Sequence, residues 1–98
     1  MEDDEAVVRV PTEDAIDLHA FQPRDVIAVV DDYLEAARDA GFTTVRLIHG
    51  RGKGMQRASI HRHLRTHALV QEFWDAAESH LGATMVRLRP ASGDLMTK

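Results

Sequence analysis

Cysteine is absent from this 98-residue sequence, which excludes disulfide bonds, zinc sites built on thiolates and a cysteine nucleophile. Aromatic residues make up only 5% of the chain, and no apolar run approaches the roughly 20 residues of a membrane-spanning helix. A secretory signal begins with basic residues, whereas this chain begins with Met1 and four acids. The length suits a single domain. We therefore expect a soluble, cytoplasmic protein without a membrane partner.

Acidic residues are missing from one long stretch. The chain has 16 acids, yet none lies between Thr43 and Gln71, a stretch that holds four of the six histidines. A local basic surface is typical of nucleic-acid binding, even in a chain whose net charge is −4. The alternative is that a charge block is only a solvated face. The basic residues of the stretch are Arg46, Arg51, Lys53, Arg57, Arg62 and Arg65.

Hydrophobic spacing divides the chain into alternating elements. We expect a disordered acidic arm at 1–12, a folded domain at 13–90 and a flexible tail at 91–98. Spacings of two predict strands, and spacings of three and four predict helices. The predicted strands are 15–19, 43–49 and 83–89, and the predicted helices are 22–41 and 56–66. The stretch 70–74 fits both periods, and spacing alone favours a helix there.

This order of elements predicts βαβ crossovers and a parallel core sheet, with both helices on one face. The predicted fold class is therefore α/β, a two-layer sandwich with one sheet face in solvent. The residues expected to face the helices are Ile16, Leu18, Val45, Leu47, Val86 and Leu88. Those expected on the solvent face are Asp17, His19, Arg46 and Arg87.

Side chains capable of acid–base chemistry lie near the ends of two predicted strands. Asp17 and His19 are two residues apart and share a face near the end of the first strand. His49 ends the second strand. Because parallel strands end side by side, where open α/β folds bind ligands, we expect these three residues to be neighbours.

A glycine-rich turn follows His49 directly. Its sequence is Gly50-Arg51-Gly52-Lys53-Gly54, and it leads into a helix whose N-terminal amides can hold an anion. Interleaved cations and backbone amides predict a phosphate-binding loop, although a plain tight turn would also explain the glycines. We add three arginines as candidate nucleic-acid contacts: Arg46, Arg57 and Arg87.

Other polar and aromatic residues have simpler interpretations. His61, His63 and His67 include a pair four residues apart, a spacing that metals use. Because no acid or thiolate lies nearby in the sequence, we interpret them as a solvated helix surface and predict no metal site. We expect Phe73 and Trp74 to lie in the core.

Three blocks of the sequence resemble the Smr (small MutS-related) domain family. They are Ile16-Asp17-Leu18-His19, then Ile48-His49-Gly50-Arg51-Gly52-Lys53-Gly54, then Leu81-Gly82-Ala83-Thr84-Met85-Val86. They come in the family's order and at matching spacing, over about residues 13–89. The departures from the family's blocks are Ala20, where a glycine is usual, and Ser79 and His80 in place of paired glycines.

The resemblance implies a fold and a function. It implies that 70–74 is a strand, giving a mixed βαβαββ sheet for an Smr-like domain at 13–90. It also implies nucleic-acid binding, with nicking or endonuclease activity in a number of members, on messenger RNA at the ribosome or on DNA in repair. The positions that carry over are Asp17, His19, His49, Gly50, Gly52 and Gly54.

RNA cleavage fits these side chains without a metal ion. Histidine can act as base or acid near neutral pH, so we predict His19 as the base, oriented by Asp17, and His49 as the acid or a second phosphate ligand. Arg51, Lys53 and the glycine amides would stabilise the developing charge. DNA hydrolysis would need an ion such as Mg²⁺, and Asp17 is the one evident carboxylate, so RNA is favoured. The alternatives are a non-catalytic RNA- or DNA-binding module, associated with ribosomes or repair, and a purely structural domain.

Overall fold

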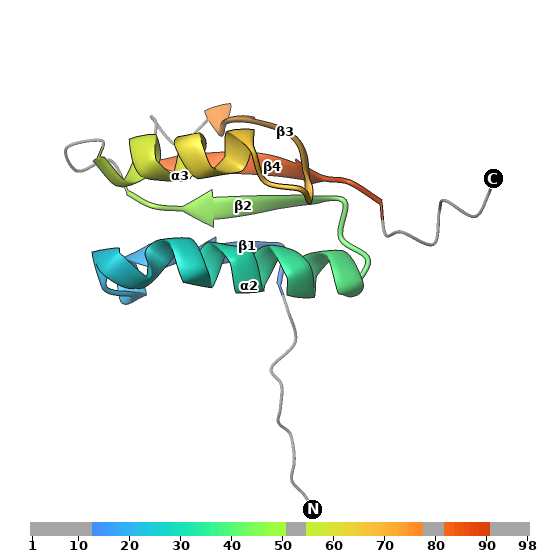
Figure 1. Ribbon diagram of the computed structural model, residues 1–98, viewed down its shortest axis with the longest axis horizontal. Helices are drawn as coiled ribbons and strands as arrows, with labels where there is room; N and C mark the ends of the chain where they lie inside the picture. Colours follow the sequence, from blue (N-terminus) through green and yellow to red (C-terminus); the bar gives the residue numbers. More distant parts are fainter. Residues whose placement is uncertain (1–12, 51–54, 78–81, 91–98) are drawn as a thin grey trace, which may run out of the picture.

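The computed structural model describes residues 13–50, 55–77 and 82–90. Figure 1 shows two helices lying along a sheet of four strands. In chain order, the elements are β1 (Ala15–Asp17), the 3-10 turns η1 (Leu18–Ala20) and η2 (Pro23–Asp25), α2 (Val26–Asp39), β2 (Thr44–Ile48), α3 (Met55–Arg65), β3 (Val70–Asp75) and β4 (Ala83–Leu88).

The sheet has the order β1-β2-β4-β3 and is mixed. β1 and β2 are parallel, whereas β4 runs antiparallel to both β2 and β3. The predicted α/β fold is therefore confirmed, as is the strand at 70–74 that the family resemblance implied. The helix that spacing alone favoured there is wrong, and the parallel core suggested by the order of elements holds only for β1 and β2. Residues 76–82 between β3 and β4 are too few for a crossover connection, so the chain can only turn back antiparallel.

Helix α2 is built as the spacing predicts. Pro23 opens the preceding turn, since its fixed backbone angle suits a helix start and it needs no hydrogen-bond acceptor. Gly41 stops the helix with a φ of +94°, a conformation that glycine adopts without strain. The buried side chains of α2 lie three or four residues apart and face the sheet: Val26, Val30, Tyr33, Leu34 and Ala37.

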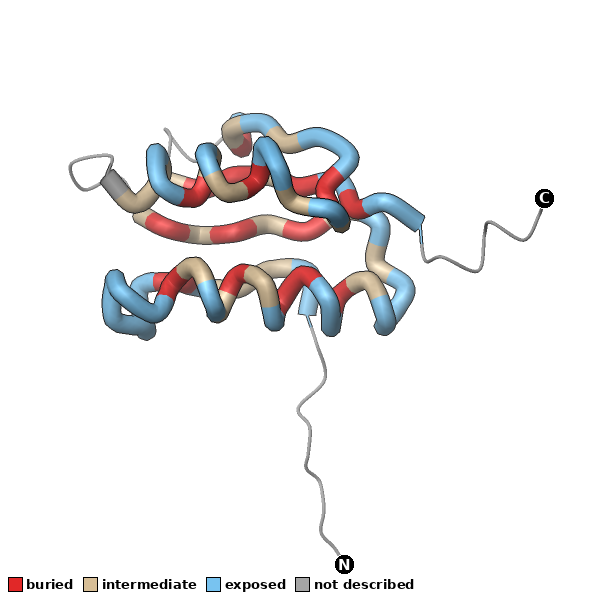
Figure 2. Tube along the Cα trace, viewed as in Figure 1, coloured by how far each residue is buried: buried red, intermediate tan, exposed pale blue. Residues whose placement is uncertain are grey.

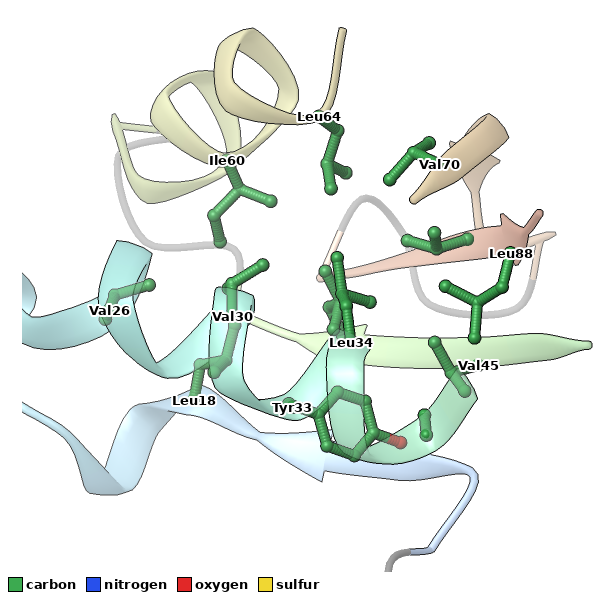
Figure 3. Packing of buried hydrophobic residues seen from close by; sticks show 13 residues of the cluster. Leu18, Val26, Val30, Tyr33, Leu34, Val45, Ile60, Leu64, Val70 and Leu88 are labelled. Carbon is green, nitrogen blue, oxygen red and sulfur yellow. The ribbon is translucent and has the colours of Figure 1, made fainter. Parts of the chain in front are cut away.

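The core lies between the two helices and one face of the sheet (Figure 3). Burial alternates along β2, with Val45 and Leu47 fully buried. Figure 2 shows the same alternation of buried and partly buried positions along the tube. The predicted inward residues Leu18, Val86 and Leu88 are also buried, and Ile16 packs against this cluster.

The opposite sheet face carries more polar side chains, as predicted. Arg87 is exposed there, and Arg46 is partly exposed. Trp74 was expected in the core but is 39% exposed, because the register of β3 against β4 turns it to this outer face, where Arg87 stacks over its ring. Phe73, which precedes it, points inward and packs on the core.

In the described parts of the chain, no helix combines the length and the apolar character needed to cross a bilayer. The predicted arm and tail, 1–12 and 91–98, lie outside the described residues.

Leu34 provides a test of the packing. It is fully buried in the middle of α2, so Leu34→Ala should lower the free energy of unfolding by about 2–5 kcal/mol through lost burial and a cavity. Asp32→Ala, an exposed change on the same helix, should stay within about 0.5 kcal/mol of the parent. Urea unfolding measures both. Equal effects would contradict this description of the core.

Candidate active site

Each of the four strands has one terminus at the same end of the sheet, measured along the strand direction. β1 and β2 both end there, because Asp17 pairs with Ile48 in the parallel register. β4 begins opposite, where Ala83 pairs with Ile48, and β3 ends there as well. Figure 1 shows this end of the sheet on the left, where β2 ends and α3 begins. We call Asp17, His19, His49, Gly50 and Thr84 the strand-end corner.

Asp17 and His19 form a hydrogen-bonded pair at the end of β1. The strand stops at Asp17, rather than at residue 19 as expected, because the Asp17 carboxylate caps the 3-10 turn that follows. Its Oδ1 accepts from the His19 backbone N–H and from ring Nδ1, each at 2.9 Å. A carboxylate can only accept, so Nδ1 carries a hydrogen and the neutral ring has its free lone pair on Nε2. The backbone and ring hydrogen bonds from His19 lower the pKa of Asp17.

The His19 ring rests on Gly50. A Cβ atom built at Gly50 would lie 2.1 Å from His19 Nε2, far inside any allowed contact. Gly50 also has a φ of +80°, which other residues adopt only with strain. Both facts require glycine at this position. The predicted proximity of His19 to the glycine turn is therefore confirmed.

The end of β2 is fastened to the start of β4. The carbonyl oxygen of Gly82 accepts from the backbone N–H of His49 at 3.0 Å and from that of Gly50 at 2.8 Å. This shared acceptor fixes the backbone on which His19 rests.

His49 is buried, with 4% of its surface exposed. Its Nδ1 donates to the carbonyl oxygen of Gly50 at 3.0 Å, and its Nε2 contacts Thr84 Oγ1 at 2.9 Å. The ring is therefore a neighbour of the His19 site, but it faces inward and both nitrogens bond within the protein. This placement differs from the exposed acid or phosphate ligand predicted from the sequence.

Thr84 joins two histidines through one hydroxyl group. His61 Nε2 lies 2.8 Å from Thr84 Oγ1, on the other side from His49. His49 Nδ1 donates its hydrogen to the Gly50 carbonyl oxygen, so Nε2 of the neutral ring carries no hydrogen and can only accept. The Thr84 hydroxyl must therefore donate to His49 Nε2. That hydroxyl then accepts from His61 Nε2–H. The result is a chain of donors that runs from α3 through β4 to the end of β2.

The buried His49 ring and the partly buried His61 ring both favour the neutral form. Burial lowers the pKa of His49 and of His61, and the nearby Arg57 charge lowers both further. A neutral His49 can keep the Gly50 carbonyl in place without burying a net charge.

Arg57 lies at the start of α3 and pairs with Asp75 at the end of β3. Its Nε and a terminal nitrogen donate to the two carboxylate oxygens at 2.8 and 2.7 Å. This pair lowers the pKa of Asp75 and raises that of Arg57. Arg57 thus joins α3 to the sheet, and its contact with phosphate stays a prediction.

The other two candidate arginines lie outside the strand-end corner. Arg46 is in the middle of β2, on the outer sheet face. Arg87 pairs with Thr44 at the opposite end of β2, about 13 Å away along the strand. Its guanidinium contacts Glu72 at 2.6 Å. Of the predicted loop residues, Arg51, Gly52, Lys53 and Gly54 lie outside the described residues.

His61, His63 and His67 do not form the solvated helix surface that the sequence predicted. His61 is largely covered, with its ring against Phe73 at 4.8 Å between centroids. His63 and His67 both contact Asp31, the acidic companion that the local sequence does not contain. Sequence reasoning also missed Thr84 and Asp75, because nothing near either residue in the sequence points to its partners.

The Smr domain family matches residues 16–89 of this chain. The protein named Endonuclease MutS2 of Thermus thermophilus is 40% identical over 77 residues, which is 76% of this chain and 10% of that protein. Endonuclease MutS2 of Brevibacillus brevis is 36% identical over 76 residues, again 76% of this chain and 10% of that protein. This chain therefore spans about a tenth of the length of these relatives.

Solved structures show the same arrangement of elements. The crystal structure of the Smr domain of Thermus thermophilus MutS2 matches with a TM-score of 0.75 and 39% identity, covering 80% of this chain and 100% of that one. YdaL, described as a stand-alone small MutS-related protein from Escherichia coli, matches with a TM-score of 0.70 and 24% identity, over 78% of this chain and 64% of YdaL. The likeness to YdaL concerns the fold alone.

Substitution of the two glycines with positive φ separates backbone strain from contact with His19. Gly41→Ala and Gly50→Ala should each lose about 1–3 kcal/mol of stability from strain. Gly41 has open space where a Cβ would be, so only Gly50→Ala should displace the His19 ring. NMR of the histidine side chains detects this displacement. An unmoved His19 ring in Gly50→Ala would contradict the close approach.

The buried histidines predict a pH dependence of stability. Each has a folded pKa below its ordinary 6.5, so the unfolded chain binds more protons between the two values. Their contribution should be complete above pH 6.5 and be lost as the pH falls through the lower folded values. Urea midpoints should therefore fall from pH 7.5 to 5.5. His61→Gln keeps an N–H donor but cannot titrate, so it should make the decline shallower.

Proposed function

Because this chain belongs to the Smr domain family, we propose that it binds nucleic acid and cleaves RNA at the strand-end corner. The observation that carries the proposal is the hydrogen-bonded Asp17–His19 pair, whose ring lies against Gly50 at the start of the glycine-rich turn. The name Endonuclease MutS2 of the relatives supports a nuclease activity. A family match over residues 16–89 supports placing that activity in this domain.

His19 is the proposed general base. Asp17 holds the ring through Nδ1, which leaves Nε2 able to accept the proton of a ribose 2′-hydroxyl. The 2′-oxygen then bonds to phosphorus and the bond from phosphorus to the 5′-oxygen breaks, with a proton from solvent completing the leaving group. The carboxylate of Asp17 stabilises the imidazolium formed on His19. The products carry a 2′,3′-cyclic phosphate and a 5′-hydroxyl.

His49 is proposed as a positioning residue rather than as the acid. Its buried ring holds the Gly50 carbonyl, and Thr84 and His61 hold the ring in turn. The backbone under His19 is thus fixed from inside the fold. This assignment replaces the direct substrate contact that the sequence suggested for His49.

The loop after Gly50 is proposed to hold the phosphate. It leads into α3, which begins at Met55, and a helix N-terminus attracts anions. Arg51 and Lys53 would add positive charge at this point, and the glycine amides would supply donors for the developing negative charge. This part of the proposal rests on the sequence.

RNA is proposed over DNA because of the carboxylates present in the corner. Asp17 already accepts two hydrogen bonds from His19, and the Asp75 carboxylate is paired with Arg57. A two-metal DNA hydrolysis site needs several carboxylates available to the ions. Attack by the 2′-hydroxyl needs a base and charge stabilisation only.

The test uses end-labelled RNA and DNA of one sequence, each with Mg²⁺ and with EDTA. We expect RNA cleavage in EDTA, with cyclic phosphate ends. His19→Ala should lower the cleavage rate by about 10²–10⁴-fold and change RNA affinity less than twofold. Asp17→Asn should cause a smaller loss, and Asp39→Asn, an exposed change at the far end of α2, should cause none.

Three results would contradict the proposal. RNA binding without cleavage by the parent protein would assign the domain to the non-catalytic binding modules. Cleavage of DNA alone, dependent on Mg²⁺ and leaving 5′-phosphates, would identify hydrolysis. If the parent cleaves RNA, full activity of His19→Ala would exclude His19 as the base.

A further inference from the structure

A second cluster of titratable side chains lies away from the strand-end corner. It joins Asp31, near the middle of α2, to His63 in the last turn of α3 and to His67 just beyond that helix. α3 begins at the corner, and His63 lies eight residues further along, which is about 12 Å. His61, which bonds to Thr84 of the corner, precedes His63 by two residues, so the two histidines lie on nearly opposite sides of α3.

Three ligand atoms converge in this cluster. Nε2 of His63 lies 2.6 Å from Asp31 Oδ1, and Nε2 of His67 lies 2.9 Å from the same oxygen. The ligand atoms all lie within 4.8 Å of one another. The two rings stand nearly perpendicular, 82° apart, with centroids separated by 5.3 Å. Two imidazoles on separate turns thus point at one carboxylate oxygen that comes from a different helix.

We propose that Asp31, His63 and His67 bind a transition-metal ion of the Zn²⁺ type, which joins α2 to α3. Two imidazole nitrogens and one carboxylate oxygen are a common set of three protein ligands for zinc, with water in the remaining position. The partial exposure of Asp31 and His63 leaves room for that water. Mg²⁺ prefers oxygen ligands and an octahedral shell, so this set selects against it.

Small movements would admit the ion. Ligand atoms around tetrahedral zinc lie about 3.3 Å apart, slightly more than the two hydrogen-bond distances here. The Asp31 and His63 side chains are partly exposed, which lets them separate by that amount. The metal takes the place of the hydrogens on Nε2, and a neutral His63 ring then carries its hydrogen on Nδ1. Asp31 Oδ1 already accepts from both imidazoles, so this oxygen is positioned as the shared point of the cluster.

His67 is the most constrained ligand. Its side chain is 12% exposed, and the Leu69 backbone N–H donates to its Nδ1 at 3.1 Å. This bond orients Nε2 toward Asp31. When Nε2 binds a metal, Nδ1 must carry the hydrogen, so the Leu69 contact is given up, which lowers affinity by about five- to tenfold. We therefore expect binding weaker than in closed four-ligand zinc sites.

The experiment titrates ZnCl₂ alone into the full 98-residue chain by calorimetry, with MgCl₂ in a parallel titration. We expect one zinc per chain and no magnesium binding at this cluster. NMR of the same sample should show zinc shifting the ring signals of His63 and His67, with those of His19 unmoved.

Matched variants locate the ion. Asp31→Asn and His63→Gln should each weaken zinc binding at least tenfold. Asp32→Asn changes the neighbouring acid on α2, and His19→Gln removes the imidazole of the strand-end corner, so both should bind within twofold of the parent. Circular dichroism confirms that each variant is folded. If a variant is unfolded, the zinc-induced shifts of the His63 and His67 ring signals in the parent protein show whether zinc binds at this cluster.

Three results would overturn the site. They are no zinc binding by the parent, unchanged affinity in His63→Gln, and equal losses in His63→Gln and His19→Gln. In the first case, the cluster is a set of hydrogen bonds between helices and nothing more. None of these results bears on RNA cleavage, because the cleavage test is read in EDTA and depends on His19.

Discussion

The strand-end corner depends on the close approach of the His19 ring to a backbone that has no side chain. Gly50 has a positive φ, and the His19 ring occupies the space that a Cβ at this position would need, so the ring lies directly against the backbone. Asp17 fixes the ring from the other side through Nδ1. An exposed imidazole is usually mobile, and here two contacts restrict it to one orientation. The position of His19 Nε2 is therefore fixed before any substrate binds.

The backbone beneath His19 is held by buried polar groups rather than by apolar packing. Gly82 accepts from two successive amides, and His49 donates to the Gly50 carbonyl. Thr84 links that ring to His61 on α3, so the corner is tied to the helix that follows the glycine-rich turn. Neutral rings suit this role, since a buried charge without a partner would destabilise the fold. His19 and His49 belong to the same corner, but His19 is exposed and His49 is buried, so only His49 can hold the backbone from inside the fold.

Spacing in the sequence predicts which residues share a face, and that was enough for much of the fold and for the pairing of Asp17 with His19. It carries no information on strand direction: the order of elements suggested a parallel core, whereas only β1 and β2 are parallel and β4 runs antiparallel to β2. It also does not give the partner of a polar side chain. His61 and His63 meet Thr84 and Asp31 across 23 and 32 residues, and those contacts exist only once α3 has packed on the sheet and beside α2. Burial of His49 follows from the same packing.

The central claim is that His19 presents an unprotonated Nε2 over Gly50. Long-range ¹⁵N–¹H NMR of the histidine rings above pH 7.5 measures this directly, because the two nitrogens resonate far apart according to which carries the hydrogen. The account predicts the Nδ1–H form for His19 and for His49, and the Nε2–H form for His61. A His19 ring with its hydrogen on Nε2 would contradict this claim, because Nδ1 could not then donate to Asp17 and Nε2 would have no lone pair to accept a proton.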